Sequence, residues 1–229
     1  MGLVHERLEE KDMAIVCYRE ALESPRSGES GDLWHAAGLL FSGREEIEPA
    51  HECFEIAAQA PDLDAPGDVW CSLGLAKTLK EDRDGALECW QKALDTPGFA
   101  HVGFVYEIMA SVYTAKGEFD RAIQYLQRAL EMPCHEADVW FELGRAYTGK
   151  RDLDRAIECF QKALGMSDFE FRGHSWADMG DVFLLKGDRV RAMECWEKAV
   201  QEYRRENKEE FAAAVMKKIS KVKARFGLR

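Results

Sequence analysis

Short stretches of helical periodicity alternate with polar turns along this chain. Residues 140–165, "WFELGRAYTGKRDLDRAIECFQKALG", contain two such stretches on either side of the polar segment "GKRD". In the first, apolar or small residues recur at i, i+3, i+4 and i+7, which predicts one face of a helix. That face consists of Trp140, Leu143, Gly144 and Tyr147. The face of the second predicted helix consists of Ala156, Ile157, Phe160, Ala163 and Leu164.

Three markers of this two-helix unit recur in register, about every 36 residues. The alanine of the second helix falls at Ala14, Ala50, Ala86, Ala122, Ala156 and Ala192. The small residue of the first helix falls at Gly2, Gly38, Gly74, Ala110, Gly144 and Gly180. The aromatic marker falls at Trp34, Trp70, Tyr106, Trp140 and Trp176. Each unit is therefore predicted to be an antiparallel helix pair, in which Gly144 and Ala156 allow the two backbones to approach closely.

These markers resemble the tetratricopeptide-repeat (TPR) family, whose pattern is Trp, Leu-Gly and Tyr, then Ala, Phe, Ala and a final Pro. The fifth unit matches it at Trp140, Leu143, Gly144, Tyr147, Ala156, Phe160 and Ala163. The third matches it at Trp70, Leu73, Gly74, Ala86, Trp90, Ala93 and Pro97. The resemblance implies an all-α fold, a right-handed α-solenoid (superhelix) of stacked antiparallel helix pairs with a C-terminal capping helix.

One array is expected over residues 1–229. Its predicted parts are a truncated repeat 1 (1–28), repeats 2 to 6 (31–64, 67–100, 103–135, 137–170 and 173–205) and the capping helix (207–226). The first marker glycine is residue 2, so either the chain is cut from a longer protein or a short helix begins the array. Asn207 and Glu210 are interpreted as a capping box at the start of the last helix. The apolar stripe expected to dock that helix is Phe211, Val215, Ile219, Val222 and Phe226.

Composition narrows the functional classes. The net charge of −11 disfavours general nucleic-acid binding, although residues 203–229 hold nine Lys and Arg against three Asp and Glu. We expect this basic end to dock on the acidic array. No run of eighteen apolar residues predicts a membrane span. Seven cysteines without a recognisable export signal favour free thiols and a cytoplasmic protein.

A cysteine recurs before the aromatic residue of the second helix, as in "ECWQKAL" at 88–94. The repeated thiols are Cys17, Cys53, Cys89, Cys159 and Cys195. A metal or redox site would need them a few ångströms apart, whereas stacked helices lie roughly 9–10 Å apart. Tyr125 replaces the cysteine in the fourth unit. We therefore interpret these cysteines as half-buried packing residues. Glu88 and Lys92 are interpreted as an i, i+4 pair facing water.

Other motifs do not predict catalysis. "GRAYTGKR" at 144–151 approaches a phosphate-binding loop, but Arg151 stands where Ser or Thr is required and Gly144 lies within a predicted helix. The six histidines form no helical His–Glu–x–x–His pair. We therefore expect no enzyme activity, no metal and no cofactor. The marker tryptophans could serve as a stacking platform, although their register favours core packing.

The resemblance implies that peptide partners lie in a groove lined by the first helices. With the marker Trp as position 4, positions 2, 5, 6, 9 and 12 would face it. The candidates are His35, Leu39, Ser42, Cys71, Ser72, Leu75, Thr78, Glu107, Ile108, Ser111, Thr114, Phe141, Glu142, Arg145, Thr148, His174, Asp178, Asp181 and Leu184. Arg145 is alone among them as a donor of the kind that binds acidic chaperone tails, so the resemblance does not extend to that activity.

The principal hypothesis is a non-catalytic protein–protein interaction scaffold whose peptide partner carries apolar anchors and basic character. A second hypothesis is self-association, giving a homo-oligomer through the uncapped N-terminal repeat. Its contact residues would be Leu3, Val4, Leu8 and Ile15. A third is that the array is the docking arm of a larger protein. Repeat arrays host unrelated partners, so the sequence names none of them.

Overall fold

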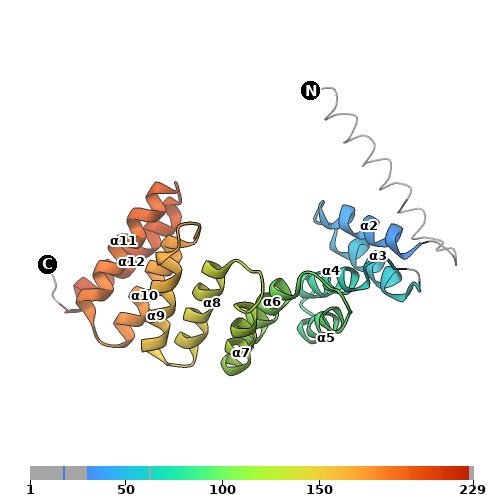
Figure 1. Cartoon of the computed structure of the whole chain (residues 1–229). Coiled ribbons are helices and arrows are strands. Elements are labelled where there is room, and N and C mark those ends of the chain that lie inside the picture. The colour runs from blue at the N-terminus through green and yellow to red at the C-terminus, as the bar shows by residue number, and fades with distance from the viewer. Residues whose placement is uncertain (1–17, 19–29, 62, 227–229) are drawn as a thin grey trace. The chain divides into compact units, whose positions relative to one another are not determined.

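The computed structural model describes residues 18, 30–61 and 63–226, and helices are the only regular elements among them (Figure 1). In the first half, the helices are α2 (Gly31–Ser42), α3 (Ile47–Gln59), α4 (Pro66–Leu79), α5 (Arg83–Leu94) and α6 (Val102–Ala115). In the second half, they are α7 (Phe119–Ala129), α8 (Glu136–Gly149), α9 (Leu153–Gly165), α10 (Arg172–Leu185), α11 (Arg189–Arg205) and α12 (Glu209–Phe226). None of these helices is both long and apolar enough to cross a membrane.

The helices form two compact units, one within Met1–Val105 and the other within Tyr106–Arg229. In the first unit α2 to α5 pack in sequence around one apolar core, and α2 also contacts α4. In the second unit α7 to α12 pack in sequence around another core, which Ala110 of α6 joins. The contact of α8 with α10 brings two first helices of neighbouring pairs together. This stacking of helix pairs is the predicted α-solenoid arrangement.

The marker glycines lie where two helices of a pair cross. A Cβ added at Gly144 would come within 2.6 Å of the Phe160 ring, and one added at Gly74 within 2.3 Å of the Trp90 indole. Gly38 and Gly180 meet aromatic rings in the same way. Close approach of the backbones at these positions is therefore confirmed, and the facing aromatic ring occupies the space that a side chain would need.

The turn within each helix pair ends the first helix in one repeated geometry. A residue with positive φ follows that helix, and the next amide donates to a carbonyl five residues earlier, as in a Schellman motif. Arg151 has φ 68°, and the Asp152 amide donates to the Tyr147 carbonyl at 3.0 Å. The equivalent residues are Glu45, Glu81, Gly117 and Gly187.

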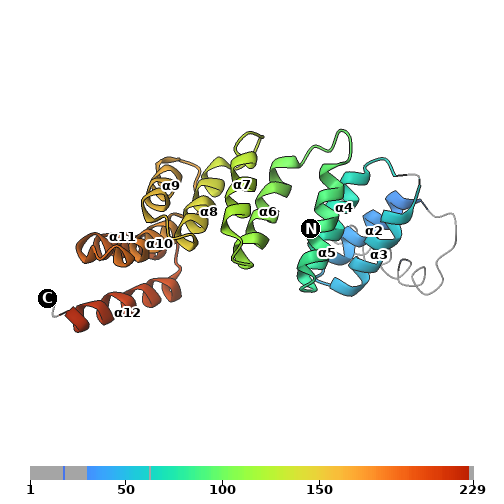
Figure 2. The same cartoon turned by 90° about the horizontal axis from the view of Figure 1, so that it is seen from below.

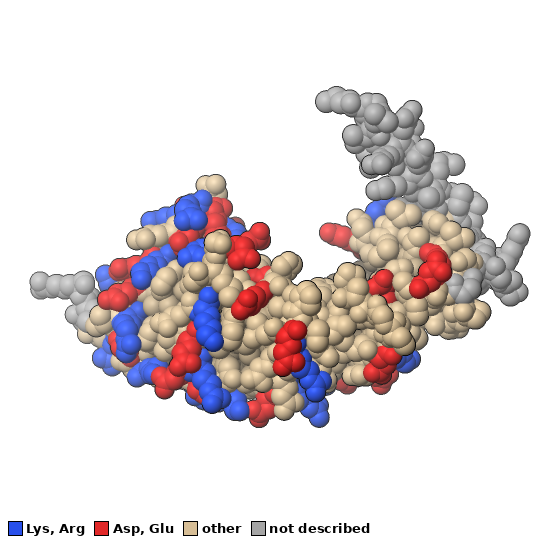
Figure 3. Space-filling view, in the orientation of Figure 1, with Lys and Arg blue, Asp and Glu red and all other residues tan. Residues whose placement is uncertain are grey.

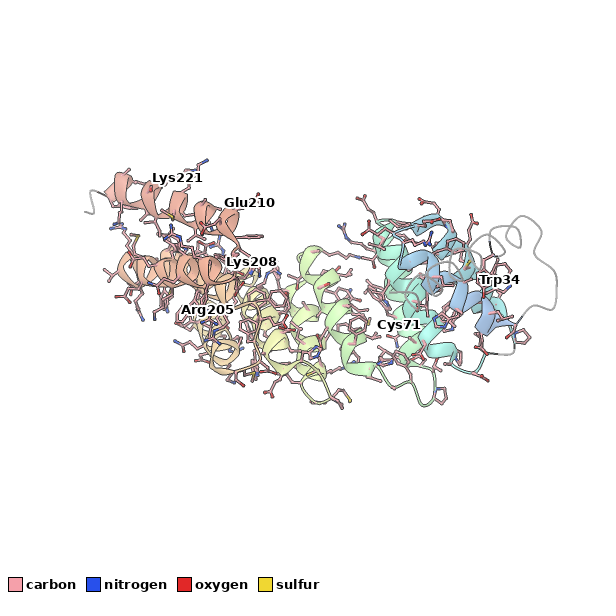
Figure 4. All side chains as sticks on the ribbon, turned by 90° about the horizontal axis from the view of Figure 1, so that it is seen from above. Trp34, Cys71, Arg205, Lys208, Glu210 and Lys221 are labelled. Carbon is pink, nitrogen blue, oxygen red and sulfur yellow. The ribbon has the colours of Figure 1, made fainter. Side chains whose placement is uncertain are left out.

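Asn207 belongs to the same series and does not cap α12 as expected. Its φ is 57°, and the Lys208 amide donates to the Tyr203 carbonyl at 2.8 Å. Asn207 therefore ends α11, because asparagine tolerates the left-handed region that this turn requires. The helix α12 begins only at Glu209, just after the turn that carries Lys208 (Figure 4).

The last helix packs on α11, as Figure 2 shows. Its docked face differs from the predicted stripe. Val215 and Val222 are buried, Ile219 packs against the core and Ala212 is also buried, at 0% exposed. Phe211 and Phe226 lie at the margins of this face, 48% and 38% exposed. Lys218 makes one of the expected contacts between this basic helix and the acidic array. Its Nζ lies 2.6 Å from Asp181 Oδ2.

The marker tryptophans carry lysines over their faces. The ammonium groups of Lys92, Lys162 and Lys198 lie 4.1, 3.8 and 4.3 Å from the ring centres of Trp70, Trp140 and Trp176, respectively. Trp34, by contrast, is buried at 3% exposed. Lys92 thus contacts an aromatic ring of its own pair rather than only facing water, and the lysines occupy the faces that a stacking platform would have to offer.

Several sequence predictions fall on residues that the structure does not describe. Repeat 1 apart from Tyr18 lies outside the described part. So do the proposed self-association residues Leu3, Val4, Leu8 and Ile15, and Cys17. The structure therefore does not test those predictions.

Candidate partner-binding site

A pocket of about 500 Å³ opens in the second unit, between α8 and α10. Its lining combines carboxylates, aromatic rings and one guanidinium. The residues are Asp138, Phe141, Glu142 and Arg145 of α8, Phe171 just before α10, and His174 and Asp178 of α10. We call this surface the acidic–aromatic pocket.

Aromatic rings form the apolar part of the acidic–aromatic pocket. Phe141 and Phe171 stack with centroids 6.3 Å apart and an interplanar angle of 14°. Phe141 is buried at 8% exposed, because it also contacts Phe160 and Phe169 behind the pocket. Phe171 stays 41% exposed. An open aromatic face supported from behind is a surface on which an apolar or planar ligand group can rest without any rearrangement.

The aromatic contacts continue beyond the pocket to α12. The His174 ring lies 6.0 Å from Phe171, 5.1 Å from Tyr203 and 5.2 Å from Phe211, between ring centroids. Tyr203 and Phe211 stack in turn at 5.4 Å. The exposed Phe211 therefore joins the same aromatic surface instead of the docking face of α12, which explains its departure from the predicted stripe.

Three carboxylates and one guanidinium supply the charge of the pocket. Arg145 Nη1 donates to Glu142 Oε1 at 3.1 Å, and Arg145 Nε lies 4.0 Å from Asp178 Oδ2. The same guanidinium carbon lies 5.9 Å from the centre of the Phe141 ring. The Arg145 side chain is 50% exposed, and such open ion pairs contribute about 0.5 kcal/mol. The guanidinium is thus held only weakly in the pocket.

Burial changes the protonation of the pocket's groups. It raises the pKa of Asp178 to about 6, against a smaller lowering by Arg145. Burial also raises the pKa of Asp138. The pKa of His174 is lowered, first by burial and then by Lys208, so the neutral imidazole is favoured at neutral pH. Carboxylates that ionise against partial burial gain most from an added positive charge.

The structure brings three of the principal sequence candidates together, namely Phe141, Arg145 and Asp178. Glu142 and His174, from the wider set of groove positions, join them. Sequence reasoning omitted Asp138 and Phe171. Asp138 occupies position 2 of the fifth unit, so the same register could have found it. Phe171 lies in the link between two helix pairs, where no helical register applies.

Three of the hydroxyl candidates, Thr78, Thr148 and Ser111, donate hydrogen bonds within their own helices. Thr78 Oγ1 donates to the Gly74 carbonyl at 3.0 Å, and Thr148 Oγ1 donates to the Gly144 carbonyl at 2.8 Å. Ser111 Oγ bonds the Ile108 carbonyl in the same manner. These hydroxyl groups can still accept a hydrogen bond from a ligand, but their single hydrogen is already donated within the helix.

Asp181 has a structural role in the second unit. Its Oδ1 accepts from the Trp196 indole at 3.1 Å and its Oδ2 lies 2.6 Å from Lys218 Nζ. This carboxylate therefore ties α10 to α11 and α12. Glu107 of α6 lies apart from the pocket lining, and burial raises its pKa to about 6.

The candidates of the first unit divide between surface and core. Leu39 and Leu75 are exposed, at 51% and 39%. His35 Nε2 and Ser72 Oγ lie 3.0 Å apart and join α2 to α4. Cys71, labelled in Figure 4, is buried at 8% exposed, so little of its thiol is open to a ligand.

The repeated cysteines pack in the cores. The exposed fractions of Cys53, Cys89, Cys159 and Cys195 are at most 5%. All cysteines in the described part of the chain are free thiols. Burial raises the pKa of the Cys159 and Cys195 thiols to about 11. Among the described residues no group of His, Cys, Asp and Glu could hold a metal ion. Thiols with raised pKa are poor nucleophiles, which fits a packing role.

Comparison with known proteins agrees with the stacked helix pairs. A family model described as tetratricopeptide repeat matches residues 109–170, and a second matches residues 1–27. The chain therefore contains tetratricopeptide repeats. TPR arrays serve in general as scaffolds for protein interaction. A search of curated proteins finds no match.

Several solved structures share the fold at low identity. YrrB, described as a TPR protein with an unusual peptide-binding site, is 20% identical, with a TM-score of 0.65 over 87% of this chain and 97% of its own. MamA from Desulfovibrio magneticus RS-1 is 20% identical, with a TM-score of 0.68 over 78% of this chain and 98% of its own. BtubC from P. vanneervenii is 18% identical, with a TM-score of 0.68 over 89% of this chain and 92% of its own.

Proposed function

We propose that this TPR protein is a non-catalytic scaffold that binds a segment of a partner protein at the acidic–aromatic pocket of its second unit. The observation that carries the proposal is the pocket of about 500 Å³ with an exposed Phe171 on its rim. Exposed aromatic residues in concave surfaces are common anchors of protein interfaces. The partner segment would supply an apolar anchor and basic character, matching the carboxylates Asp138, Glu142 and Asp178.

The surrounding charges support this choice of site. Lys and Arg side chains gather over the second unit, interspersed with Asp and Glu (Figure 3). Within the pocket, however, the carboxylates outnumber the cations. A basic segment would therefore be attracted more strongly to the pocket than to the mixed charges around it, which favours one register of binding. The free buried thiols also support a cytoplasmic location.

Affinity capture from the native source, followed by mass spectrometry, tests the proposed site. The wild-type chain would be compared with a double variant, Glu142→Lys with Phe171→Ala. We expect the principal partner to be lost, because both the charge and the aromatic anchor of the pocket are removed.

A matched double variant, Glu158→Lys with Phe104→Ala, controls for changes in charge and in exposed apolar surface. Both residues are exposed, Phe104 at 45%, and neither lines the pocket. The control should capture the same partner as the wild type. Equal capture by the pocket variant and the control would contradict the proposed site.

A further inference from the structure

The acidic–aromatic pocket already contains a basic side chain of the protein itself. Arg145 makes two kinds of contact there, with the Glu142 and Asp178 carboxylates and with the Phe141 ring. These are the contacts through which a site binds a guanidinium from another chain. The contacts of Arg145 therefore indicate that the pocket can bind a guanidinium group.

The contacts of Arg145 leave much of the pocket unused. Asp138 and the exposed face of Phe171 also line it, but the contacts of the Arg145 guanidinium are with Glu142, Asp178 and Phe141. Arg145 is half exposed, and its distance of 4.0 Å to Asp178 is at the limit of an ion pair. The pocket thus offers a further carboxylate and a further aromatic face to a second cation.

We propose that the acidic–aromatic pocket binds an arginine side chain of the partner segment, and that Arg145 is an internal competitor that occupies part of the pocket in the free protein. This rests on the pocket being the partner-binding site. An incoming guanidinium would lie on Phe171 and pair with Asp138 and Asp178. Arginine fits better than lysine, because its planar group stacks on an aromatic ring while its fork reaches carboxylates.

Amide chemical shifts of the full-length protein, measured by NMR, test the proposal without a known partner. The probes are N-acetyl-arginine amide, its lysine equivalent, and N-acetyl-citrulline amide, which has nearly the shape of arginine but no charge. We expect the arginine probe to give saturable shifts at the amides of residues 138–145 and 171–178. The lysine and citrulline probes should bind at least about two- to fivefold more weakly.

The decisive variant is Arg145→Gln. Removing a competitor should strengthen binding of the arginine probe by about two- to threefold, whereas removing an ordinary contact residue would weaken it. Arg155→Gln is the matched control. Arg155 also pairs with a carboxylate, Asp152 at 3.5 Å, and lies 5.6 Å from the Tyr147 ring, but it is outside the pocket. It should leave binding unchanged.

Phe171→Ala should weaken the arginine probe by about two- to fivefold, with Phe104→Ala as the control. Citrulline or lysine binding as tightly as arginine, a weaker or unchanged affinity in Arg145→Gln, or no saturable shifts would each overturn the proposal. Shifts at these amides that depend on protein concentration without any probe would instead point to the basic α12 of a second copy. Failure of the probes with partner capture still dependent on the pocket would leave the proposed function standing.

Discussion

At the scale of single residues, several turns within the helix pairs place a non-glycine residue in the strained left-handed region of the backbone. Gly117 and Gly187 occupy the left-handed position in two of these turns, but Glu45, Glu81 and Arg151 occupy it in others, with φ of 62°, 64° and 68°. A side chain with a Cβ meets the following carbonyl in this region, which costs about 1 kcal/mol. The turn geometry is therefore set by the helices that it joins, and not by its own sequence.

Replacing Arg151 by glycine should stabilise the second unit. Arg151→Gly removes the Cβ from a position with φ 68°, and we expect the free energy of unfolding to rise by about 1 kcal/mol. Urea denaturation followed by circular dichroism measures this change. Arg151→Ala is the control, because it removes the charge but keeps the Cβ. An equal gain in both variants would show that the charge, and not the backbone, was responsible.

Protonation of Asp178 should make the folded protein more stable as the pH falls. Its pKa is raised to about 6 in the folded protein from an ordinary value near 3.8, because burial disfavours the carboxylate. Between these two values the folded state binds more protons than the unfolded state, so its stability rises as the pH falls. The ionised carboxylate is correspondingly unfavourable above pH 6.

We therefore expect Asp178→Asn to raise the midpoint of denaturation at pH 7.5 and to have little effect near pH 4. Urea titrations of the variant and the wild type at the two pH values measure the difference. A variant less stable than the wild type at pH 7.5 would mean that the Arg145 contact outweighs the cost of burying the charge.

At the scale of elements, the size of one residue on the first helix is matched to its facing residue on the second. Gly144 faces Phe160, and Gly180 faces Trp196. The corresponding residues of the fourth unit are Ala110 and Leu126, both 1% exposed in the same core. A smaller facing side chain leaves room for a methyl group. The crossing distance of a pair thus depends on two positions sixteen residues apart.

Gly144→Ala should destabilise the second unit by about 1–3 kcal/mol, since the new Cβ would lie 2.6 Å from the Phe160 ring. Thermal denaturation measures the loss. The control is Gly165→Ala, because nothing lies within 4 Å of a Cβ at that helical position. Adding Phe160→Leu to Gly144→Ala should recover part of the loss and reproduce the Ala110–Leu126 pair. Strictly additive effects of the two substitutions would argue against a shared crossing.

At the scale of the whole molecule, the described chain has two cores, and the second depends on α12 for its last layer. Ala212, Val215 and Val222 of α12 belong to that core. In a repeat array each pair contacts only its neighbours, so the loss of a terminal layer affects the adjacent helices most. We therefore expect stability to vary along the chain instead of being shared equally.

Val215→Ala should reduce amide protection in α10 to α12 and leave α2 to α5 unchanged. Val215 is 5% exposed, and the shortened side chain should cost about 2 kcal/mol. Hydrogen exchange with mass spectrometry resolves the two units. Met216→Ala is the control, because that neighbour is 44% exposed. A uniform loss of protection along the chain would indicate a single cooperative unit.

The sequence predicted the helix pairs because their signals are periodic and local. Gly144 and Trp140 recur in register, and the small residues at the crossings follow from the need for close backbone approach. The repeated cysteines were predicted to be half-buried packing residues; the structure places Cys53, Cys89, Cys159 and Cys195 fully in the cores. By contrast, the role of Asn207 was mispredicted, because the same residue type can end one helix or begin the next.

The sequence by itself therefore determined the helical elements, their pairing and the residues that pack between them. Only the tertiary structure decided which exposed side chains meet. Phe171 lies in a link outside the helical register, yet its ring stacks on Phe141 of α8. Arg145 occurs at a repeated position, but its contacts with Glu142 and Asp178 depend on how α8 and α10 pack. Periodicity specifies which face a residue occupies, whereas a binding site requires distances between faces of different helices.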